Sequence, residues 1–365
     1  MAKQKHRLIF DSLHADILSG KFNHDGRLPS EESLCRTWAV SRPTVARALK
    51  DLQIQGLIDR RAGSGTYLRA ETRPIQIILG LLVEGLGKTE ILDPICAEIT
   101  RAAQQRGCGV FTGGLPPEKS AEILAAEWFD NGVRGIFFAP LEQSASGRQA
   151  VNTGIVTAFK NAGISVVLVD RDTLEFPHRS DCDLVAIDSF HAGCELGGHL
   201  AECGSKRIAL IARPDYPSTT DFRLNGLREG LRRGGVGQLD FHVGDPENID
   251  FVRDLCLSSP AYDTFVCSND QTAARFMQSA FSLGFHVPDN FKLAGFDDAG
   301  FASLLPVPLT TIRQPCRDIG TACVDTMIGR LRHPELPARA VLLRGELVIR
   351  QSTGSGAPGR RDKIG

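Results

Sequence analysis

The stretch SRPTVARALKDL, residues 41 to 52, has the pattern of a short amphipathic helix with one basic side. Apolar residues recur at i, i+3, i+4 and i+7 and would form one stripe: Val45, Ala48, Leu49 and Leu52. The other side carries Arg42, Thr44, Arg47 and Lys50. We expect Ser41 to be the N-cap and Pro43 to lie in the first turn, where a missing N–H costs little. Such a helix is typical of proteins that read the DNA major groove, although a basic face is also common on solvated helices.

A second short helix is expected immediately before this one. Residues 28 to 38 predict a helix with Ser30 as N-cap and with Glu31 and Glu32 at the positive end of its dipole. A turn over residues 39 to 41 joins the two helices, which is the arrangement of a helix-turn-helix. The flanking sequence therefore favours DNA recognition over a solvated basic face.

A β-hairpin is expected after the basic helix. The run LIDRRAGSGTYL, residues 57 to 68, predicts two short strands around a turn at 62 to 65. This wing would carry Arg60 and Arg61. Residues 5 to 21 predict a further helix that packs beneath the helix-turn-helix.

Residues 1 to 70 resemble the winged helix-turn-helix of the GntR family of bacterial transcription regulators. The matching segments are LPSE (28–31), SRPTV (41–45), AL (48–49), GLI (56–58) and GSGTY (63–67). The resemblance implies contacts with double-stranded operator DNA at Ser30, Arg42, Thr44, Arg47, Lys50, Arg60, Arg61, Gly63 and Gly65. Glu32 and Ala46 stand where many members have Arg, so the operator sequence does not transfer from the family.

The charge of the chain is distributed unevenly. The 365 residues contain 42 Lys+Arg and 43 Asp+Glu, but residues 1 to 70 alone contain 12 and 7, an excess of five positive charges. This excess lies where phosphate binding would need it. The sequence contains no apolar run of about 18 residues and no signal-peptide core, so we expect a cytoplasmic protein without a membrane segment.

The cysteines and histidines do not indicate a metal site. The ten cysteines form no CxxC pair and the nine histidines lack ligand spacing. We expect free, mostly buried thiols, no metal and no cofactor. GLGKT at 85 to 89 follows an expected strand, but Leu82 occupies the position where a P-loop needs Gly. Since the sequence also lacks a G-x-S-x-G elbow and a G-x-G-x-x-G fingerprint, we do not expect an enzyme.

From Ile75 onward, apolar strands alternate with amphipathic helices in two series. The first series has strands at 75–83, 108–112, 134–140 and 165–170, and the second begins at 184–188 and continues through 207–212, 265–268 and 291–296. Repeated βα units predict an α/β fold with two Rossmann-like parallel sheets. Ligands bind beyond the carboxyl ends of such strands, so a cleft is expected between two subdomains.

Polar residues are concentrated at these strand ends. They are Asp170, Arg171 and Asp172; Asn269 and Asp270; Asp297 and Asp298; and, at the start of a helix, Asp221, Phe222 and Arg223. Any one of them alone reads best as a turn or helix cap. Together, with Phe176, Phe222 and Phe296 as a stacking face, they suit a neutral polyhydroxylated ligand, because each hydroxyl needs a donor and an acceptor.

Residues 75 to about 353 resemble the effector-binding domain of the LacI/GalR family, which is similar to periplasmic sugar-binding proteins. The matching motifs are VDRD (169–172), GGHLAECGSKRIALI (197–211), FRLNGL (222–227), SNDQTA (268–273), GFDD (295–298), LTTIRQP (309–315) and LVIRQST (347–353). The resemblance implies effector contacts at Asp170, Arg223, Asn269, Asp297 and Gln314, and we add their neighbours Arg171 and Phe222.

The two resemblances divide the chain. We expect a DNA-binding domain at 1–70, a linker at 71–74, an effector domain at 75–353 and a flexible tail at 354–365. Within the effector domain, an N-subdomain of about 75–185 and 315–342 and a C-subdomain of about 186–312 and 343–353 would be joined by crossovers near 185, 313 and 343.

The combination is similar to arabinose-responsive repressors. It implies a homodimeric regulator, a repressor of sugar uptake or catabolism genes that a bound sugar releases from operator DNA. A purine nucleobase effector, a co-repressor mode and an α/β sugar enzyme with a DNA-binding appendage are the alternatives. The sequence does not identify the sugar, the operator or the regulated genes.

Overall fold

The computed structural model describes most of the chain: residues 2–18, 22, 26–61, 64–69, 77–84, 87, 90–115, 119–141, 148–175, 177–214 and 216–354. They form two compact units, Met1–Leu79 with Arg101–Phe111, and Gly80–Thr100 with Thr112–Gly365. The expected linker at 71–74 and residues 355–365 of the expected tail lie outside the described residues. The domain boundaries drawn from the sequence stay predictions.

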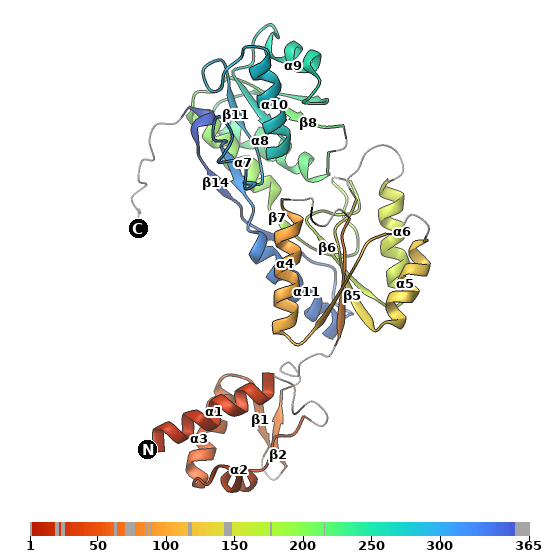
Figure 1. The fold of residues 1–365 in the computed structure, drawn as a ribbon, viewed down its shortest axis with the longest axis vertical. Coiled ribbons are helices and arrows are strands. Elements are labelled where there is room, and N and C mark those ends of the chain that lie inside the picture. The colour runs from red at the N-terminus through yellow and green to blue at the C-terminus, as the bar shows by residue number, and fades with distance from the viewer. Residues whose placement is uncertain are drawn as a thin grey trace. The chain divides into compact units, whose positions relative to one another are not determined.

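The first unit contains a helix-turn-helix followed by a hairpin (Figure 1). Its elements are α1 (Ala2–Leu18), α2 (Glu31–Trp38), α3 (Arg42–Ile54), β1 (Ile58–Arg61) and β2 (Gly65–Leu68). The two strands pair antiparallel with Ile58 opposite Leu68, which confirms the expected wing. Helix α1 lies about a turn earlier than the 5–21 expected from its apolar spacing.

The core of this unit is built on the apolar stripe of α3. Val45, Ala48, Leu49 and Leu52 are all buried and pack in one cluster with residues of α1, α2 and the wing. His6 Nε2 of α1 also lies 2.7 Å from Asp51 Oδ2 of α3. Because one face of α3 is used for packing, its polar face is left for other contacts.

A six-stranded sheet has the order β13-β7-β6-β5-β3-β4. The strands are β3 (Ile78–Leu82), β4 (Gly109–Gly113), β5 (Val133–Phe138), β6 (Ser165–Val169), β7 (Asp183–Ile187) and β13 (Ala340–Leu343). Helices α4 (Leu92–Gln105) and α11 (Cys316–Arg332) lie on one face, and α5 (Ala121–Asp130) and α6 (Arg148–Asn161) on the other (Figure 1). This arrangement is the α/β fold predicted from the alternating pattern.

Strand β7 corrects the sequence analysis. We expected residues 184–188 to open the second series, but β7 pairs in parallel with β6 on one side and with β13 on the other. Buried parallel strands have near-continuous apolar sequences whichever sheet they join, so the pattern does not identify the sheet. The partner β13 lies about 150 residues further along the chain, and no local signal announces it.

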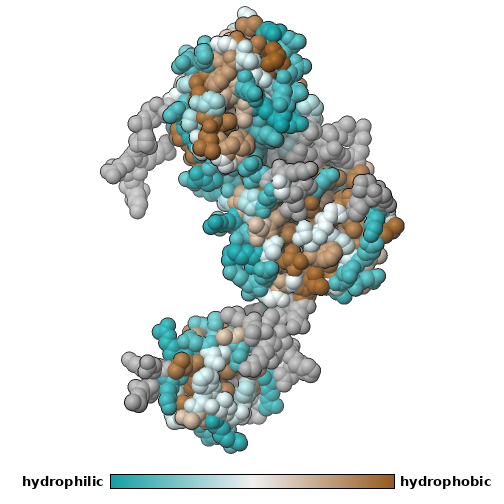
Figure 2. Space-filling model, viewed as in Figure 1, coloured by the Kyte–Doolittle hydropathy of each residue, from teal (hydrophilic) through white to brown (hydrophobic). Residues whose placement is uncertain are grey.

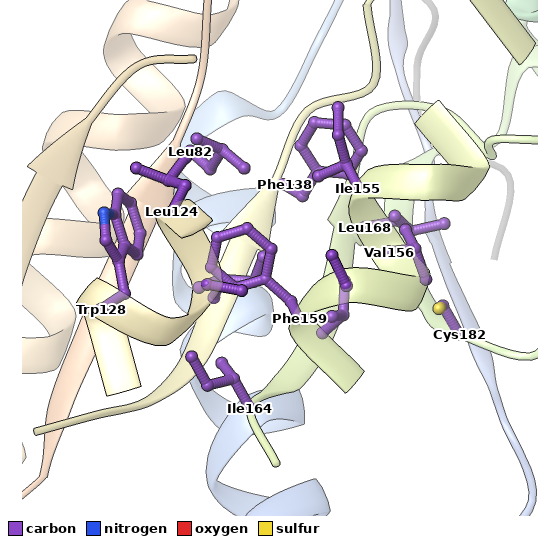
Figure 3. Packing of buried hydrophobic residues seen from close by; sticks show 14 of the residues in the cluster. Leu82, Leu124, Trp128, Phe138, Ile155, Val156, Phe159, Ile164, Leu168 and Cys182 are labelled. Carbon is purple, nitrogen blue, oxygen red and sulfur yellow. The ribbon is translucent and has the colours of Figure 1, made fainter. Parts of the chain in front are cut away.

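The core between this sheet and helices α5 and α6 is closely packed (Figure 3). Trp128 and Phe159 meet edge to face with ring centroids 5.5 Å apart. Gly113 lies against the indole, and a Cβ built on it would clash with that ring. Such interiors tolerate little change in volume. The sheet therefore gives the residues at its strand ends a rigid support.

A second, four-stranded parallel sheet has the order β11-β10-β8-β9. Its strands are β8 (Arg207–Ala212), β9 (Gln238–Val243), β10 (Thr264–Cys267) and β11 (Lys292–Ala294). The accompanying helices are α7 (Ser189–Glu202), α8 (Thr219–Arg233), α9 (Ile249–Cys256) and α10 (Asp270–Ser282). Strands β12 (Thr311–Arg313) and β14 (Glu346–Val348) form an antiparallel pair, and the 3-10 turn Gln351–Thr353 follows β14.

The chain passes between the two sheets where β7 leads to α7, where β12 leads to α11 and where β13 leads to β14. Figure 2 shows hydrophobic and hydrophilic residues interspersed on the face in view. None of the helices in the described ranges is long and apolar enough to span a bilayer. All ten cysteines are free thiols.

Candidate effector pocket and DNA-binding surface

A cavity of about 210 Å³ lies in the second unit, at the carboxyl ends of strands from both sheets. Six of the seven predicted effector residues line it: Asp170, Arg171, Arg223, Asn269, Asp297 and Gln314. They come from the ends of β6, β10, β11 and β12 and from α8. The strand-end rule thus brings together residues that are up to 144 positions apart, as between Asp170 and Gln314.

The predicted aromatic face does not form as expected. Phe222 is not among the residues that line the cavity, and Phe296 is buried beneath Arg223, with its ring centroid 4.8 Å from the guanidinium carbon. Phe176 lies outside the described residues. Adjacent helical residues point in different directions, so Arg223 and Phe222 of α8 do not both face the cavity. Phe301, which the sequence did not single out, supplies an aromatic side chain.

Asp297 stands at the centre of a polar network. Its Oδ1 accepts a hydrogen bond from Gln314 Nε2 at 2.8 Å and one from Arg223 Nη2 at 3.3 Å. Arg223 Nη1 donates to the carbonyl oxygen of Ser268 at 2.5 Å. Burial raises the pKa of Asp297 to about 6 and the Asp170 carboxylate adds to the rise, while Arg223 and Gln314 oppose it.

Asp170 forms a second ion pair on the other side of the cavity. Its Oδ2 accepts from Arg171 Nε at 3.0 Å and lies 2.9 Å from Arg171 Nη2, and both side chains are nearly fully buried. The backbone φ is +71° at Asp170 and +118° at Asp297. Non-glycine residues rarely adopt positive φ, and such strain gathers at functional sites. Two of the aspartates in the cavity wall are therefore held in place against their backbone preference.

The buried Thr219 Oγ1 and Gln314 Oε1 in the cavity wall have no hydrogen-bond partner among the described residues. Gln314 Nε2 donates to Asp297, so the amide must turn its oxygen elsewhere. A buried acceptor without a partner costs about 1–3 kcal/mol. A ligand hydroxyl that donates to Gln314 would remove this cost.

Other strand-end carboxylates support the fold. Asp270 is buried and accepts from Thr311 Oγ1 at 2.6 Å and from the Ala299 amide at 2.9 Å. Asp298 binds Arg313 and Arg350. Asn269 has two roles, because its side chain caps α10 through the Thr272 amide at 2.8 Å and it also lines the cavity. The turn-and-cap interpretation thus holds for part of the cluster.

The basic face of α3 is open. Arg42, Arg47 and Lys50 are exposed, and they make no hydrogen bond or ion pair with any described residue. Thr44 is half-buried, and its Oγ1 lies 3.0 Å from Ser41 Oγ. Ser41 occupies the N-cap position as predicted, although its side chain makes no capping hydrogen bond. Ser30 does cap α2, with its Oγ accepting from the Ser33 amide.

The wing is held by contacts with other residues of this unit. Arg60 pairs with Glu31 at the start of α2, so its charge is partly satisfied. The Arg61 side chain and Gly63 lie outside the described residues, and Gly65 has φ of +126°, which suits glycine. Arg27, which the sequence analysis missed, donates to the Ser64 carbonyl at 3.2 Å and lies 5.9 Å from the Tyr67 ring centroid. It thus supports the wing turn.

Comparison with known proteins agrees both with the helix-turn-helix and wing and with the domain that contains the cavity. Residues 5–68 match the family described as bacterial regulatory proteins, gntR family. Residues 198–353 match the periplasmic binding protein-like domain. The chain is a transcriptional regulator that combines a GntR-type DNA-binding domain with a periplasmic binding protein-like effector domain. This assignment confirms the expected fold class and the expectation that the regulator is not an enzyme.

The regulator's relatives are repressors. It is 27% identical over 353 residues to the arabinose metabolism transcriptional repressor of Geobacillus stearothermophilus, covering 92% of this chain and 94% of that one. It is 32% identical over 182 residues to the ribose operon repressor of Escherichia coli K12, covering 48% and 55% of the two chains.

Solved structures of similar fold include the transcriptional regulator CelR in complex with cellobiose. That structure has a TM-score of 0.64 and 21% identity, and the match covers 86% of the regulator and 91% of the CelR chain. A LacI-family regulator from Enterococcus faecium with bound ribose has a TM-score of 0.59 and 21% identity, covering 75% and 98%.

The regulator's affinity for a hydroxylated ligand should depend on pH through Asp297. Sugar hydroxyls donate to the ionised carboxylate, so binding favours loss of the proton. Since the Asp297 pKa is raised to about 6, the affinity should be constant above that pH and fall by roughly tenfold for each pH unit below it. Calorimetric titration at several pH values measures this. An affinity that stays unchanged from about pH 7 to about pH 5 would contradict an ionised Asp297 in the complex.

Proposed function

We propose that the regulator represses genes for the uptake or catabolism of a pentose, and that the pentose binds in the cavity and releases the regulator from operator DNA. We further propose that it acts in the cytoplasm as a homodimer. The observation that carries this proposal is the convergence of two carboxylate–guanidinium pairs and an unpartnered amide oxygen on one small cavity.

The chemistry of the cavity wall supports a neutral polyhydroxylated ligand. Asp170 and Asp297 accept hydrogen bonds, Arg171 and Arg223 donate them, and each carboxylate lies beside a guanidinium. A sugar hydroxyl can donate to one and accept from the other at the same time. Glu90 adds a third carboxylate to the wall, so the carboxylates outnumber the guanidiniums and disfavour an anionic ligand such as a sugar phosphate.

The size of the cavity supports a monosaccharide. Its volume of about 210 Å³ is below the range of about 300–1,000 Å³ of pockets that hold drug-sized ligands. The names of the relatives point to five-carbon sugars, arabinose and ribose. A similar structure from Alkaliphilus metalliredigens, of TM-score 0.61 and 21% identity, is complexed with D-xylulofuranose.

A thermal-shift panel of pentoses, hexoses, sugar phosphates and purine nucleobases tests the ligand class. A ligand that binds only the folded chain stabilises it by about 2.7 kcal/mol at a hundred times its dissociation constant. We expect a pentose to raise the Tm most and the phosphate of the same pentose to raise it little. A purine that raises the Tm more than any sugar would contradict the proposal.

The same panel, repeated with labelled operator DNA, tests the sign of regulation. The pentose should weaken operator binding, and by linkage the operator should weaken pentose binding by the same factor. Operator binding that becomes tighter on adding the pentose would make it a co-repressor, and operator binding that does not change would exclude coupling.

A further inference from the structure

Helices α7 and α8 touch through their backbones. Gly193 and Gly197 of α7 face Gly226 and Gly230 of α8, and a Cβ built on any of the four would lie less than 3.0 Å from a backbone atom of the other helix. No other pair of helices in the described residues makes as extensive a contact. The two helices can lie this close because glycine has no side chain, and the packing leaves no space for a methyl group at these positions.

Two of these glycines lie at the pocket end of the contact. A Cβ on Gly193 would collide with the carbonyl oxygen of Arg223, and one on Gly226 would collide with that of Phe190. Arg223 is the residue of α8 that enters the cavity wall. The spacing between the two helices at this point therefore sets where the backbone of Arg223 lies.

The guanidinium of Arg223 is fixed at its other end. It donates to the Ser268 carbonyl, pairs with Asp297 and lies over the ring of Phe296, and its side chain is only 6% exposed. These partners belong to the strand ends of the four-stranded sheet. If the α8 backbone moved away from α7 while the partners stayed in place, at least one of these contacts would be lost.

Helix α7 also begins at a connection between the two sheets. The Asp188 amide, at its N-cap, donates to the Leu343 carbonyl of β13 at 2.7 Å, and the Asp188 carboxylate caps the helix through the His191 amide. The start of α7 is thus tied to the six-stranded sheet. The glycine contact therefore fixes the position of Arg223 relative to the same sheet. Strand β6 of that sheet carries Asp170 on the other side of the cavity.

We propose that Gly193 and Gly226 are positioning residues for Arg223, so that the regulator's affinity for its sugar depends on the absence of side chains at these two sites. The inference rests on the proposed function in that Arg223 contacts the bound sugar. The two glycines themselves touch no ligand and act only through the backbone of α8.

The test compares three alanine variants of the full chain. Gly193→Ala places a methyl group against Arg223. Gly230→Ala causes a collision of the same kind, with the Cys194 carbonyl, two turns further along α8. Gly198→Ala puts a methyl group into open space on α7, where alanine favours the helix. For each variant we would measure the Tm, the operator affinity without sugar and the dissociation constants for ribose and arabinose.

We expect Gly193→Ala to weaken sugar binding by roughly tenfold, the value of one hydrogen bond to a charged group, while operator binding persists. Gly230→Ala should lower the Tm comparably and keep the sugar affinity within about twofold, and Gly198→Ala should change neither. Sugar binding that is unchanged in Gly193→Ala overturns the proposal. Equal losses in Gly193→Ala and Gly230→Ala also overturn it, because the loss would then follow general destabilisation.

A second comparison separates positioning from folding. Lysine at position 223 keeps the charge on a flexible stem, so it can follow a displaced helix where the planar guanidinium cannot. Gly193→Ala should therefore weaken sugar binding less in an Arg223→Lys background than in the wild type, and additive losses would contradict the role. If Gly193→Ala does not fold, Gly226→Ala takes its place, because its methyl group collides with the Phe190 carbonyl at the same pocket end of the contact.

The outcome for the wild type separates this inference from the proposed function. A wild-type chain that binds neither ribose nor arabinose contradicts the pentose proposal alone. The compound that raises the wild-type Tm in the panel then serves as the probe for the same glycine variants.

Discussion

Replacing Arg223 by alanine should abolish the response to the sugar while operator binding persists. The side chain is buried, pairs with Asp297 and holds the Ser268 carbonyl, so its removal takes away a ligand donor and leaves a carboxylate without its cation. Removing one partner of a buried charge pair in a binding site costs about 2–5 kcal/mol, which corresponds to a loss of about 30-fold or more in affinity. Calorimetric titration of the sugar, beside operator binding measured by fluorescence anisotropy, gives both quantities.

Arg228→Ala is the matched control for Arg223→Ala. Arg228 lies on the same helix, is exposed and makes no ion pair with a described residue, so its loss should leave the sugar affinity unchanged. A variant at Arg223 that binds sugar like the wild type would remove the residue from the site. If Arg223→Ala loses sugar and operator binding together and has a lowered Tm, its role is in folding.

Alanine at Arg42 or Arg47 should cause the largest loss of operator binding. Both side chains are exposed on the open face of α3, and an Arg that reads a guanine edge contributes about 1–3 kcal/mol of discrimination. A variant that has lost a base contact should bind operator less tightly and discriminate less against other DNA. If the lost contact is to phosphate, all sequences should weaken alike and the salt dependence should become shallower.

Lys5→Ala is the control for these two variants. It removes one positive charge from an exposed position of α1 in the same unit, so it tests the effect of charge alone. The measurement is anisotropy with operator and with scrambled DNA at several salt concentrations. If Arg42→Ala and Arg47→Ala both match Lys5→Ala, α3 is not the recognition helix.

The sequence predicted elements whose signals are local. The stripe of α3, the cap at Ser30 and the wing follow from periodicity and turn residues within a few positions. The pocket residues at strand ends followed from one topological rule. Pairing between distant segments was not predicted. Strand β7 pairs with the distant strand β13, and Arg60 pairs with Glu31, 29 positions earlier.

The role of each strand-end carboxylate was also beyond the sequence. Asp297 and Asp298 are adjacent and chemically identical, yet Asp297 lines the cavity and Asp298 binds Arg313 and Arg350. The backbone geometry of a tight bend decides which one faces the ligand. No sequence motif marks Thr219 or Phe301. Only the folded arrangement of the strands shows that both residues line the cavity.

The positive φ angles at Asp170 and Asp297 lower the stability of the folded chain at two residues that its proposed function needs. Each such residue stores on the order of 1–3 kcal/mol of strain, and glycine in its place would fold with less. Selection for thermal stability alone would therefore favour glycine at these two positions. The substitution would remove the ligand-binding carboxylates together with the strain. A more heat-resistant descendant of this chain with glycine at either position would have become a repressor that no longer responds to its sugar.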